Sequence, residues 1–196
     1  MWEDRFNHLE AVMKKYKSKK IALRLPRSHR GQAAQGDKSH TMKQKTKVDA
    51  EDGKQELVIT REFDLPVELL FKAYVAPDIV EQWMGTTVLK LESKKHGSYQ
   101  FETSDAQGNV LFQASGVIHE FVPNQKITRT FEMENTPFGI QLEFFEFEKL
   151  TDDTSKLSMH IVFRSVAYRD QLLQIPFAHG LNRAHNRLQD IVSKLH

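Results

Sequence analysis

The sequence predicts an α+β domain in which a curved antiparallel sheet of six to seven strands is covered by one long C-terminal helix. Three features of the order of segments predict this fold. One strand-like segment is followed by two short helical segments, a series of strand-like segments then fills most of the chain, and the last segment carries a single apolar helical stripe. A sheet with one apolar face must bury that face, and only the last helix is long enough to cover it.

The first strand and the two short helices come before the main run of strands. Residues 56–63, ELVITREF, are rich in β-branched and aromatic residues, as a strand requires. Asp64 is placed to cap the helix that follows, a proline-containing break at residues 76–78 separates that helix from the next, and Gly85 ends the second one. The two helices are too short to cover a sheet, so we expect them to close one end of it.

The remaining strands are joined by short turns. Gly, Asn, Asp and Pro in the connections favour antiparallel neighbours. Within one strand the apolar alternation changes phase, which predicts a β-bulge near Phe144 or Phe145. The strands are expected at residues 87–93, 98–104, 110–122, 126–134, 140–150 and 156–166. The final helix follows from a stripe with helical spacing, formed by Phe177, Leu181, Ala184, Leu188, Ile191 and Leu195.

Charge divides the chain into two parts. Residues 1–55 hold 14 Lys and Arg against 7 Asp and Glu, a net charge of +7, whereas residues 56–196 have a net charge of −5. We interpret residues 1–55 as a basic, flexible extension with a short amphipathic helix at 2–16, and residues 56–196 as the folded domain. Residues 1–30 are either a membrane-surface or partner-binding helix, or a disordered extension, or a sequence upstream of a true start at Met42.

Composition excludes several classes of protein. The chain of 196 residues has no Cys, which excludes disulfides, thiolate nucleophiles and zinc sites built on Cys. Apolar runs are too short to span a bilayer, and no signal peptide is recognisable, so a cytoplasmic location is expected. The acidic domain is a poor candidate for nucleic-acid binding. The chain has no GxSxG, HExxH, P-loop or Rossmann motif, and the spacing of the His residues predicts no metal site, so neither a metal nor a cofactor is expected.

A curved sheet and a helix leave a cavity between them, which is a usual place for ligands. Strand parity assigns residues to its walls, although plain core packing would also explain the aromatic ones. Arg61 and Arg129 share the inward phase, and each needs an anionic ligand group or a buried Glu unless it reaches the rim or points outward. Small residues at Ala114 and Gly116 would leave room. The predicted cavity residues are Arg61, Trp83, Tyr99, Phe101, Phe112, Arg129, Phe131, Met133, Phe163, Phe177 and Leu181.

Residues 57–85, LVITREFDLPVELLFKAYVAPDIVEQWMG, resemble the opening signature of the family related to the C-terminal domain of the activator of Hsp90 ATPase. The segment GVIHEFVPNQKITRTF resembles a later strand and turn of that family. The resemblance covers residues 56–196 and implies the helix-grip fold of the SRPBCC superfamily, which START-like lipid-binding domains and the birch pollen allergen share. Two departures border the expected cavity. Leu181 stands where relatives commonly have Trp, and Met84 where they often have an aromatic residue.

Three functions follow as hypotheses. The first is a module that binds a small hydrophobic or amphipathic ligand, with Trp83 near the entrance and Arg61 or Arg129 as polar anchors. The second, implied by the resemblance, is a protein that associates with the chaperone Hsp90. The third is a cyclase-like or hydrolytic enzyme, which would need an acid–base pair facing the cavity. The candidates for that pair are Glu102, His119, Glu120 and His160.

Overall fold

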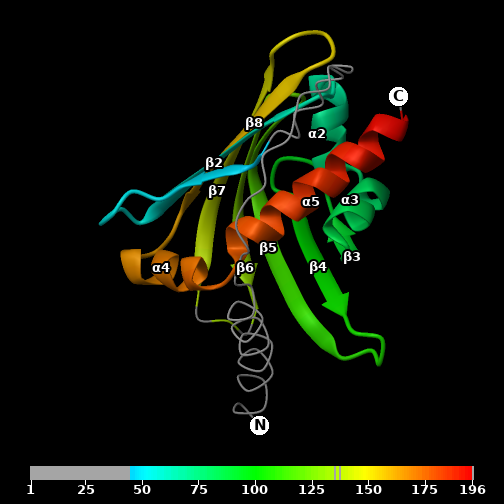
Figure 1. The fold of residues 1–196 in the computed structure, drawn as a ribbon. Coiled ribbons are helices and arrows are strands. Elements are labelled where there is room, and N and C mark those ends of the chain that lie inside the picture. Colours follow the sequence, from blue (N-terminus) through cyan, green and yellow to red (C-terminus); the bar gives the residue numbers. More distant parts are fainter. Residues whose placement is uncertain (1–44, 135, 137, 196) are drawn as a thin grey trace, which may run out of the picture. The chain divides into compact units, whose positions relative to one another are not determined.

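The computed structural model describes residues 45–134, 136 and 138–195. The predicted helix at residues 2–16 therefore lies outside the described residues. Eight strands form one antiparallel sheet in the order β1-β2-β8-β7-β6-β5-β4-β3, and α5 crosses one face of it (Figure 1). The strands are β1 (Lys47–Asp49), β2 (Glu56–Phe63), β3 (Thr87–Leu91), β4 (Ser98–Ser104), β5 (Val110–Val122), β6 (Lys126–Met133), β7 (Ile140–Lys149) and β8 (Ser155–Val162). The helices are α2 (Val67–Val75), α3 (Pro77–Met84), α4 (Val166–Gln174), α5 (Phe177–Val192) and the 3₁₀ turn η1 (Ser193–Leu195).

The predicted α+β architecture of an antiparallel sheet and a long C-terminal helix is confirmed, but the sheet has eight strands instead of six to seven. The extra strand, β1, lies within the stretch predicted as a flexible extension. It pairs with β2, with Val48 opposite Ile59. A strand of three residues with one half-buried side chain carries too little apolar pattern to be recognised in a sequence.

Helix α4 is a second difference. The sequence predicted a strand to residue 166, whereas β8 ends at Val162 and α4 begins at Val166. The helix starts where the Ser165 hydroxyl accepts a hydrogen bond from the Tyr168 N–H at 3.4 Å, a usual N-cap arrangement. Its apolar residues form no clear stripe, which is why periodicity did not reveal it.

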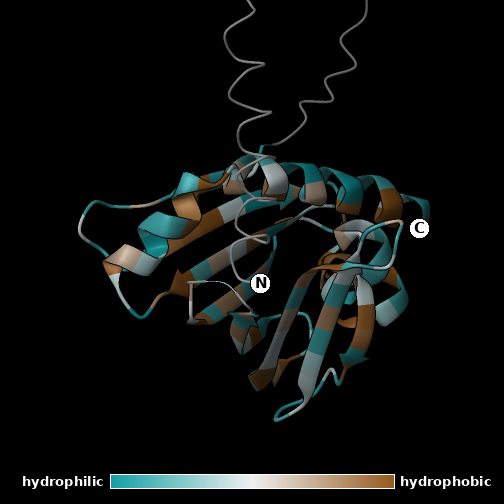
Figure 2. Cartoon of the chain, turned by 90° about the horizontal axis from the view of Figure 1, so that it is seen from below, coloured by the Kyte–Doolittle hydropathy of each residue, from teal (hydrophilic) through white to brown (hydrophobic). Residues whose placement is uncertain are grey.

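The core lies between the sheet and the helices on its inner face. Along β2 and β8 every second residue is buried, among them Leu57, Ile59, Leu157 and Ile161. Hydropathy changes from residue to residue along the strands in Figure 2, where the C-terminal helix lies over the sheet. Within the described residues, no helix has the length and apolarity to cross a membrane.

The predicted bulge in β7 is wrong. The strand pairs in continuous register with both neighbours, from Leu142 opposite Val162 to Lys149 opposite Ser155 on one side. Its inward phase never changes, and instead two polar residues, Gln141 and Glu143, occupy buried positions. The sequence pattern was misleading because polar residues on a buried phase look like a change of phase.

Helices α2 and α3 lie beside the C-terminal half of α5, as expected for elements that close one end of the sheet (Figure 1). Asp64 does not cap α2 as predicted, since Pro66 is the N-cap residue. Instead, the Asp64 backbone N–H donates to the Gln189 side-chain oxygen of α5 at 3.0 Å, and the Gln189 Nε2 donates to the Asp64 carbonyl oxygen at 3.1 Å. Gly85 ends α3 as predicted, with a φ of 69° that favours glycine. Arg187 of α5 donates to the Trp83 carbonyl oxygen at 2.9 Å and so fastens α5 to α3.

Candidate functional site

A cavity of about 210 Å³ lies between the inner face of the sheet and α5. Seven of the residues predicted for its walls line it: Trp83, Phe101, Arg129, Phe131, Met133, Phe177 and Leu181. Met84, expected to border the cavity, lines it as well. The remaining lining residues were not predicted: Tyr74, Val80, Gln141, Glu143, Phe145, Met159, Ile161, Leu172, Ala184 and His185. The cavity is thus mostly apolar, with a few polar groups gathered on β6, β7 and α5.

Four predicted wall residues are placed elsewhere. Phe163 is buried in the core beyond the cavity, and Phe112 is half-buried on β5. Tyr99 is buried on β4, and its hydroxyl donates to the Thr130 carbonyl oxygen at 2.6 Å. Arg61 is buried beneath the N-terminal half of α5, among polar groups that do not line the cavity.

Gly116 does not leave free room, because the Tyr99 side chain fills the space above it. The two residues are opposite each other on β5 and β4. A Cβ atom on Gly116 would lie 2.6 Å from the Tyr99 hydroxyl and 1.9 Å from the Thr130 carbonyl oxygen. The glycine therefore serves the packing of Tyr99 against β6, and the cavity begins beyond this contact.

Arg129 and Glu143 form an ion pair on the inner face of the two central strands. They are opposite each other in the β6–β7 register, and the Arg129 Nε donates to Glu143 Oε2 at 2.7 Å. Their side chains are only 15% and 7% exposed. The guanidinium also lies over the rings of Tyr99 and Phe145, at 4.8 and 4.6 Å from their centroids. Burial opposes its charge, but Tyr99 and Glu143 outweigh this effect and raise the pKa of Arg129.

Gln141 is the neighbour of this pair along β7. Gln141 is only 4% exposed, and it lines the cavity. Within the part of the chain that the structure describes, its amide makes no hydrogen bond, and the terminal nitrogens of Arg129 make none either. Among the described residues, Arg61 Nε is the one fully buried polar side-chain atom without a hydrogen bond, so these groups of Arg129 and Gln141 keep some accessible surface. The site therefore has hydrogen-bonding groups that remain available to a bound molecule.

His185 connects α5 to α2 and to the segment before β1. Its Nε2 lies 3.2 Å from the Tyr74 hydroxyl and its Nδ1 lies 2.8 Å from the Thr46 hydroxyl. The ring is fully buried, and this burial together with the nearby charge of Arg61 lowers the pKa of His185 to about 3. His185 is therefore neutral at physiological pH, with both ring nitrogens engaged.

Arg61 is a buried cation with weak partners. Its Nη1 donates to the Thr46 hydroxyl at 3.3 Å and to the Asn182 carbonyl oxygen at 3.5 Å, and its Nε has no partner among the described residues. The guanidinium lies over the Phe63 ring at 4.9 Å. Burial lowers the pKa of Arg61, and electrostatic interactions with Tyr74, Asp190 and Asp64 reduce this effect. The residue anchors the segment before β1 against α5 and does not reach the cavity.

The titratable residues proposed for an enzyme are all away from the cavity. His160 bonds Glu56 at 2.7 Å with both side chains about two-fifths exposed, Glu120 accepts from Thr128, and Glu102 accepts from Gln113. His119 is exposed. Within the described residues, no group of three or more His, Asp or Glu is placed to hold a metal ion.

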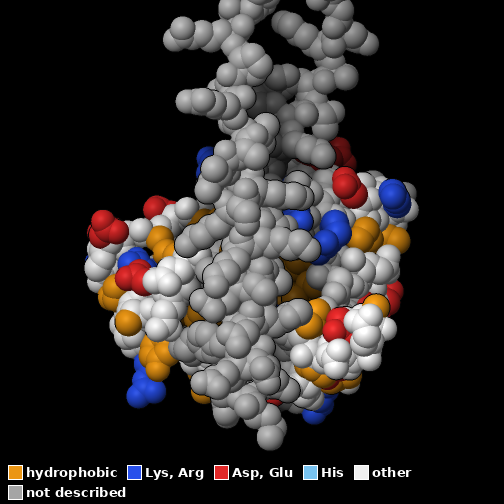
Figure 3. All heavy atoms as spheres, turned by 60° about the horizontal axis from the view of Figure 1, so that its bottom comes forward, with side chains coloured by type: hydrophobic (Ala, Val, Ile, Leu, Met, Phe, Trp, Pro, Cys, Tyr) orange, Lys and Arg blue, Asp and Glu red, His pale blue; other side chains and the backbone are white. Residues whose placement is uncertain are grey.

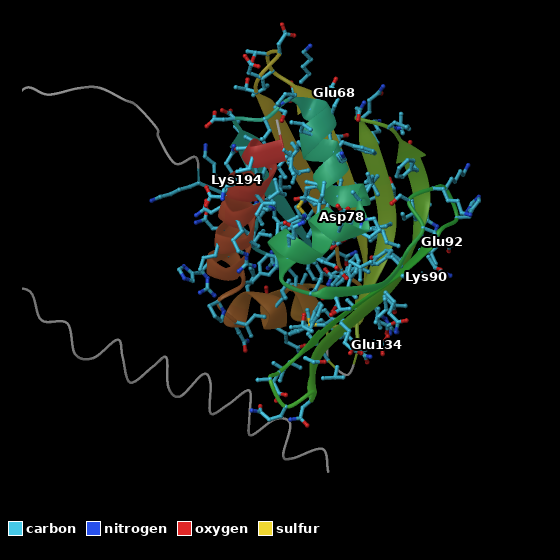
Figure 4. The ribbon with its side chains drawn as sticks, turned by 90° about the vertical axis from the view of Figure 1, so that its right-hand side faces the viewer. Glu68, Asp78, Lys90, Glu92, Glu134 and Lys194 are labelled. Carbon is cyan, nitrogen blue, oxygen red and sulfur yellow. The ribbon has the colours of Figure 1, made fainter. Side chains whose placement is uncertain are left out.

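On the parts of the surface left visible in Figure 3, apolar side chains lie interspersed with charged ones. Charged residues of α2, α3, β3 and η1, such as Glu68, Asp78, Lys90 and Lys194, project outward in Figure 4. One of the labelled carboxylates, Glu92, accepts from the Ser98 backbone N–H and from Lys90, which lowers its pKa to about 2. The apolar cavity with its buried ion pair combines concavity with specific polar groups.

Part of the cavity could have been found by closer reading of the sequence. The polar residues Gln141 and Glu143 share the phase of Phe145 and Phe147, and a Glu on a buried phase calls for a cation on the neighbouring strand. Arg129, already predicted to face inward, is that cation. His185 and Tyr74 gave no such signal, because their burial depends on how α5 packs over α2.

A family model, described as "Activator of Hsp90 ATPase homolog 1-like protein", matches residues 64–193. The chain belongs to this family. The resemblance deduced from the sequence is thereby confirmed. No curated protein matches the chain significantly.

Several solved structures share the fold of this chain at low sequence identity. The crystal structure of protein Ms6760 from Mycobacterium smegmatis is 18% identical, has a TM-score of 0.66, and the match covers 74% of this chain and 95% of that one. A protein from Rhodobacter sphaeroides is 15% identical with a TM-score of 0.69, covering 76% and 99%. A solution structure from Arthrobacter aurescens is 14% identical with a TM-score of 0.67, covering 76% and 91%. These likenesses support the helix-grip type of fold.

Met84 and Leu181, the two positions at which the sequence departs from the expected family pattern, both line the cavity. Met84 stands at the end of α3, and Leu181 stands in the first half of α5.

Proposed function

We propose that this protein is a binding module for a small, mostly apolar molecule that carries a polar group. The observation that supports the proposal is the cavity itself, whose apolar walls surround Arg129, Glu143 and Gln141. Apolar walls supply binding free energy, and a few fixed polar groups supply orientation and specificity. The seven predicted wall residues that line the cavity are proposed to contact the ligand directly.

The volume limits the size of the ligand. An engineered protein cavity of about 150 Å³ holds benzene, so about 210 Å³ suits a molecule with on the order of eight to ten non-hydrogen atoms. A long-chain lipid would need the cavity to enlarge. A compact ring compound fits without such a change.

Ligand-dependent stability tests the proposal. A ligand that binds only the folded protein, at about one hundred times its Kd, raises the free energy of unfolding by about 2.7 kcal/mol. We therefore expect at least one compound from a panel of small ring compounds to raise the unfolding midpoint of the full chain. If no compound of the proposed size does so, the proposal is wrong.

A pair of variants of α5 shows whether binding occurs in this cavity. Ala184 lines the cavity, so Ala184→Leu fills part of it. Ala178 is exposed on the same helix, so Ala178→Leu adds the same atoms outside it. Stabilisation by the compound should be lost in Ala184→Leu and kept in Ala178→Leu. An equal response of both variants would place the binding elsewhere.

Association with the chaperone Hsp90 is a second candidate function, and the family membership is the observation that favours it. Such an association would use the protein surface and would not require the cavity. A pull-down with purified Hsp90 and the full chain tests it. Retention of the chain that is unaffected by Ala184→Leu would support a chaperone role separate from ligand binding.

A further inference from the structure

Building on the proposed function, we infer that the cavity selects a neutral carbonyl compound over a carboxylate of the same shape, with Arg129 and Gln141 donating hydrogen bonds to the carbonyl oxygen. The inference follows from the position of these groups, from the hydrogen bonds they leave unused and from the charge that Glu143 already supplies.

Arg129 and Gln141 are neighbours on the cavity wall. Arg129 is opposite Glu143 and Phe131 is opposite Gln141 in the β6–β7 register. Arg129 and Gln141 are therefore diagonal neighbours on the same face of the sheet, which brings long side chains within reach of one another. Both line the cavity, on strands at the middle of its sheet wall.

Arg129 and Gln141 have hydrogen-bond donors that the fold does not use. A guanidinium has five N–H donors, and the contact with Glu143 engages Nε. Among the described residues, the two terminal nitrogens of Arg129 and the amide of Gln141 have no hydrogen-bond partner. Donors therefore outnumber the remaining acceptors, namely the second Glu143 oxygen and the Gln141 oxygen. A bound molecule satisfies this excess by bringing an acceptor.

Charge comes third. The 2.7 Å ion pair makes the site neutral overall. A carboxylate bound to the terminal nitrogens of Arg129 would lie close to Glu143, and two like charges in a poorly solvated site repel strongly. It would also lose its own hydration. A ketone or aldehyde oxygen accepts the same hydrogen bonds without either cost, so a neutral acceptor is favoured.

Three probes of equal size separate these effects. Acetophenone, α-methylstyrene and benzoate have the same number of non-hydrogen atoms and a planar group on a phenyl ring. The first offers a neutral acceptor, the second no acceptor, and the third an anion. Binding can be followed in the full chain by ¹³C-methyl NMR of methionine, because Met84, Met133 and Met159 line the cavity. Met→Leu variants assign the three signals.

We expect acetophenone to bind roughly ten-fold or more tightly than α-methylstyrene, the factor typical of a hydrogen bond to a charged group, and more tightly than benzoate. Equal binding of acetophenone and α-methylstyrene would overturn the inference and leave the proposed function intact. Tightest binding of benzoate would also overturn it, and would make Arg129 an anion anchor. Failure of all three probes would contradict the proposed function itself for compounds of this size.

Variants attribute the preference to the named groups. In Gln141→Leu the ion pair remains, and the preference for acetophenone over α-methylstyrene should fall by roughly two- to ten-fold. In the double variant Arg129→Met/Glu143→Met only the Gln141 donor remains, so the preference should fall to no more than the two- to ten-fold share expected of Gln141. The matched control, Arg183→Met/Glu146→Met, removes one exposed charge of each sign and should leave the preference unchanged. An undiminished preference in both cavity variants would refute the assignment.

Discussion

Removing one partner of the Arg129–Glu143 pair should destabilise the fold far more than removing both. Arg129→Met leaves Glu143 as an unpaired carboxylate in a side chain that is only 7% exposed. Breaking a buried ion pair in this way costs about 3–5 kcal/mol, whereas replacing the whole pair with apolar side chains of similar volume is often nearly neutral. Because Met fits both positions, the double variant should lose little stability.

The two single variants should differ from each other. After Glu143→Met, the Arg129 guanidinium still lies over the rings of Tyr99 and Phe145. Such contacts contribute about 0.5–2 kcal/mol to the stability of a cation. The loss in Glu143→Met should therefore be smaller than the loss in Arg129→Met.

Urea denaturation of the wild type, both single variants and the double variant measures these losses. The coupling energy is the amount by which the two single losses together exceed the double loss, and we expect several kcal/mol. The pair Lys149–Asp152, at 2.6 Å, is the control, because its side chains are 53% and 92% exposed and its coupling should be too small to resolve. A similarly small coupling for Arg129 and Glu143 would refute the view that the pair is shielded from water.

Other predictions concern His185 and two glycines. Because the pKa of His185 is about 3 in the folded state, its contribution to stability is complete above about pH 6.5 and is lost as the pH falls toward 3. As the pH falls through this range, the free energy of unfolding should decrease in both proteins, and the decrease should be steeper in the wild type than in His185→Gln by up to about 1.4 kcal/mol per pH unit. Parallel pH curves for the two proteins would contradict the burial of the neutral ring. Gly116→Ala should cost about 2–3 kcal/mol or more, because its Cβ would lie 1.9 Å from the Thr130 carbonyl oxygen. Gly180→Ala, with no atom within 4 Å of the new Cβ, should gain up to about 1 kcal/mol in the same urea assay, and a loss there would show that α5 is packed differently.

The fold could be predicted because its main elements have strong local patterns. The alternation of β2 and β8 and the apolar stripe of α5 both match the buried residues of the structure. Strand β1 and helix α4 were missed for a shared reason. Each is held in place by contacts with distant parts of the chain, such as the bond from Thr46 to His185 and the bond from Arg169 to the Glu51 carbonyl oxygen.

The cavity could be predicted only in part, because parity identifies which side of a strand faces inward but not how far along the strand the cavity extends. Phe101, Arg129, Phe131 and Met133, which parity places on the inward side, line the cavity, whereas Tyr99 faces inward and lies outside it. Its position depends on the missing side chain of a glycine on the next strand. Pairwise details of this kind require the register, which a sequence alone does not give.

The measurement that tests the central claim most directly compares native with denaturing mass spectrometry of the full chain, purified gently from its own host. Occupation of the cavity predicts an added mass that disappears on denaturation, is retained in Ala178→Leu and is absent from Ala184→Leu. A bare mass for the wild type under native conditions, with no gain when acetophenone is added, would contradict the claim that the space beneath α5 is a binding site.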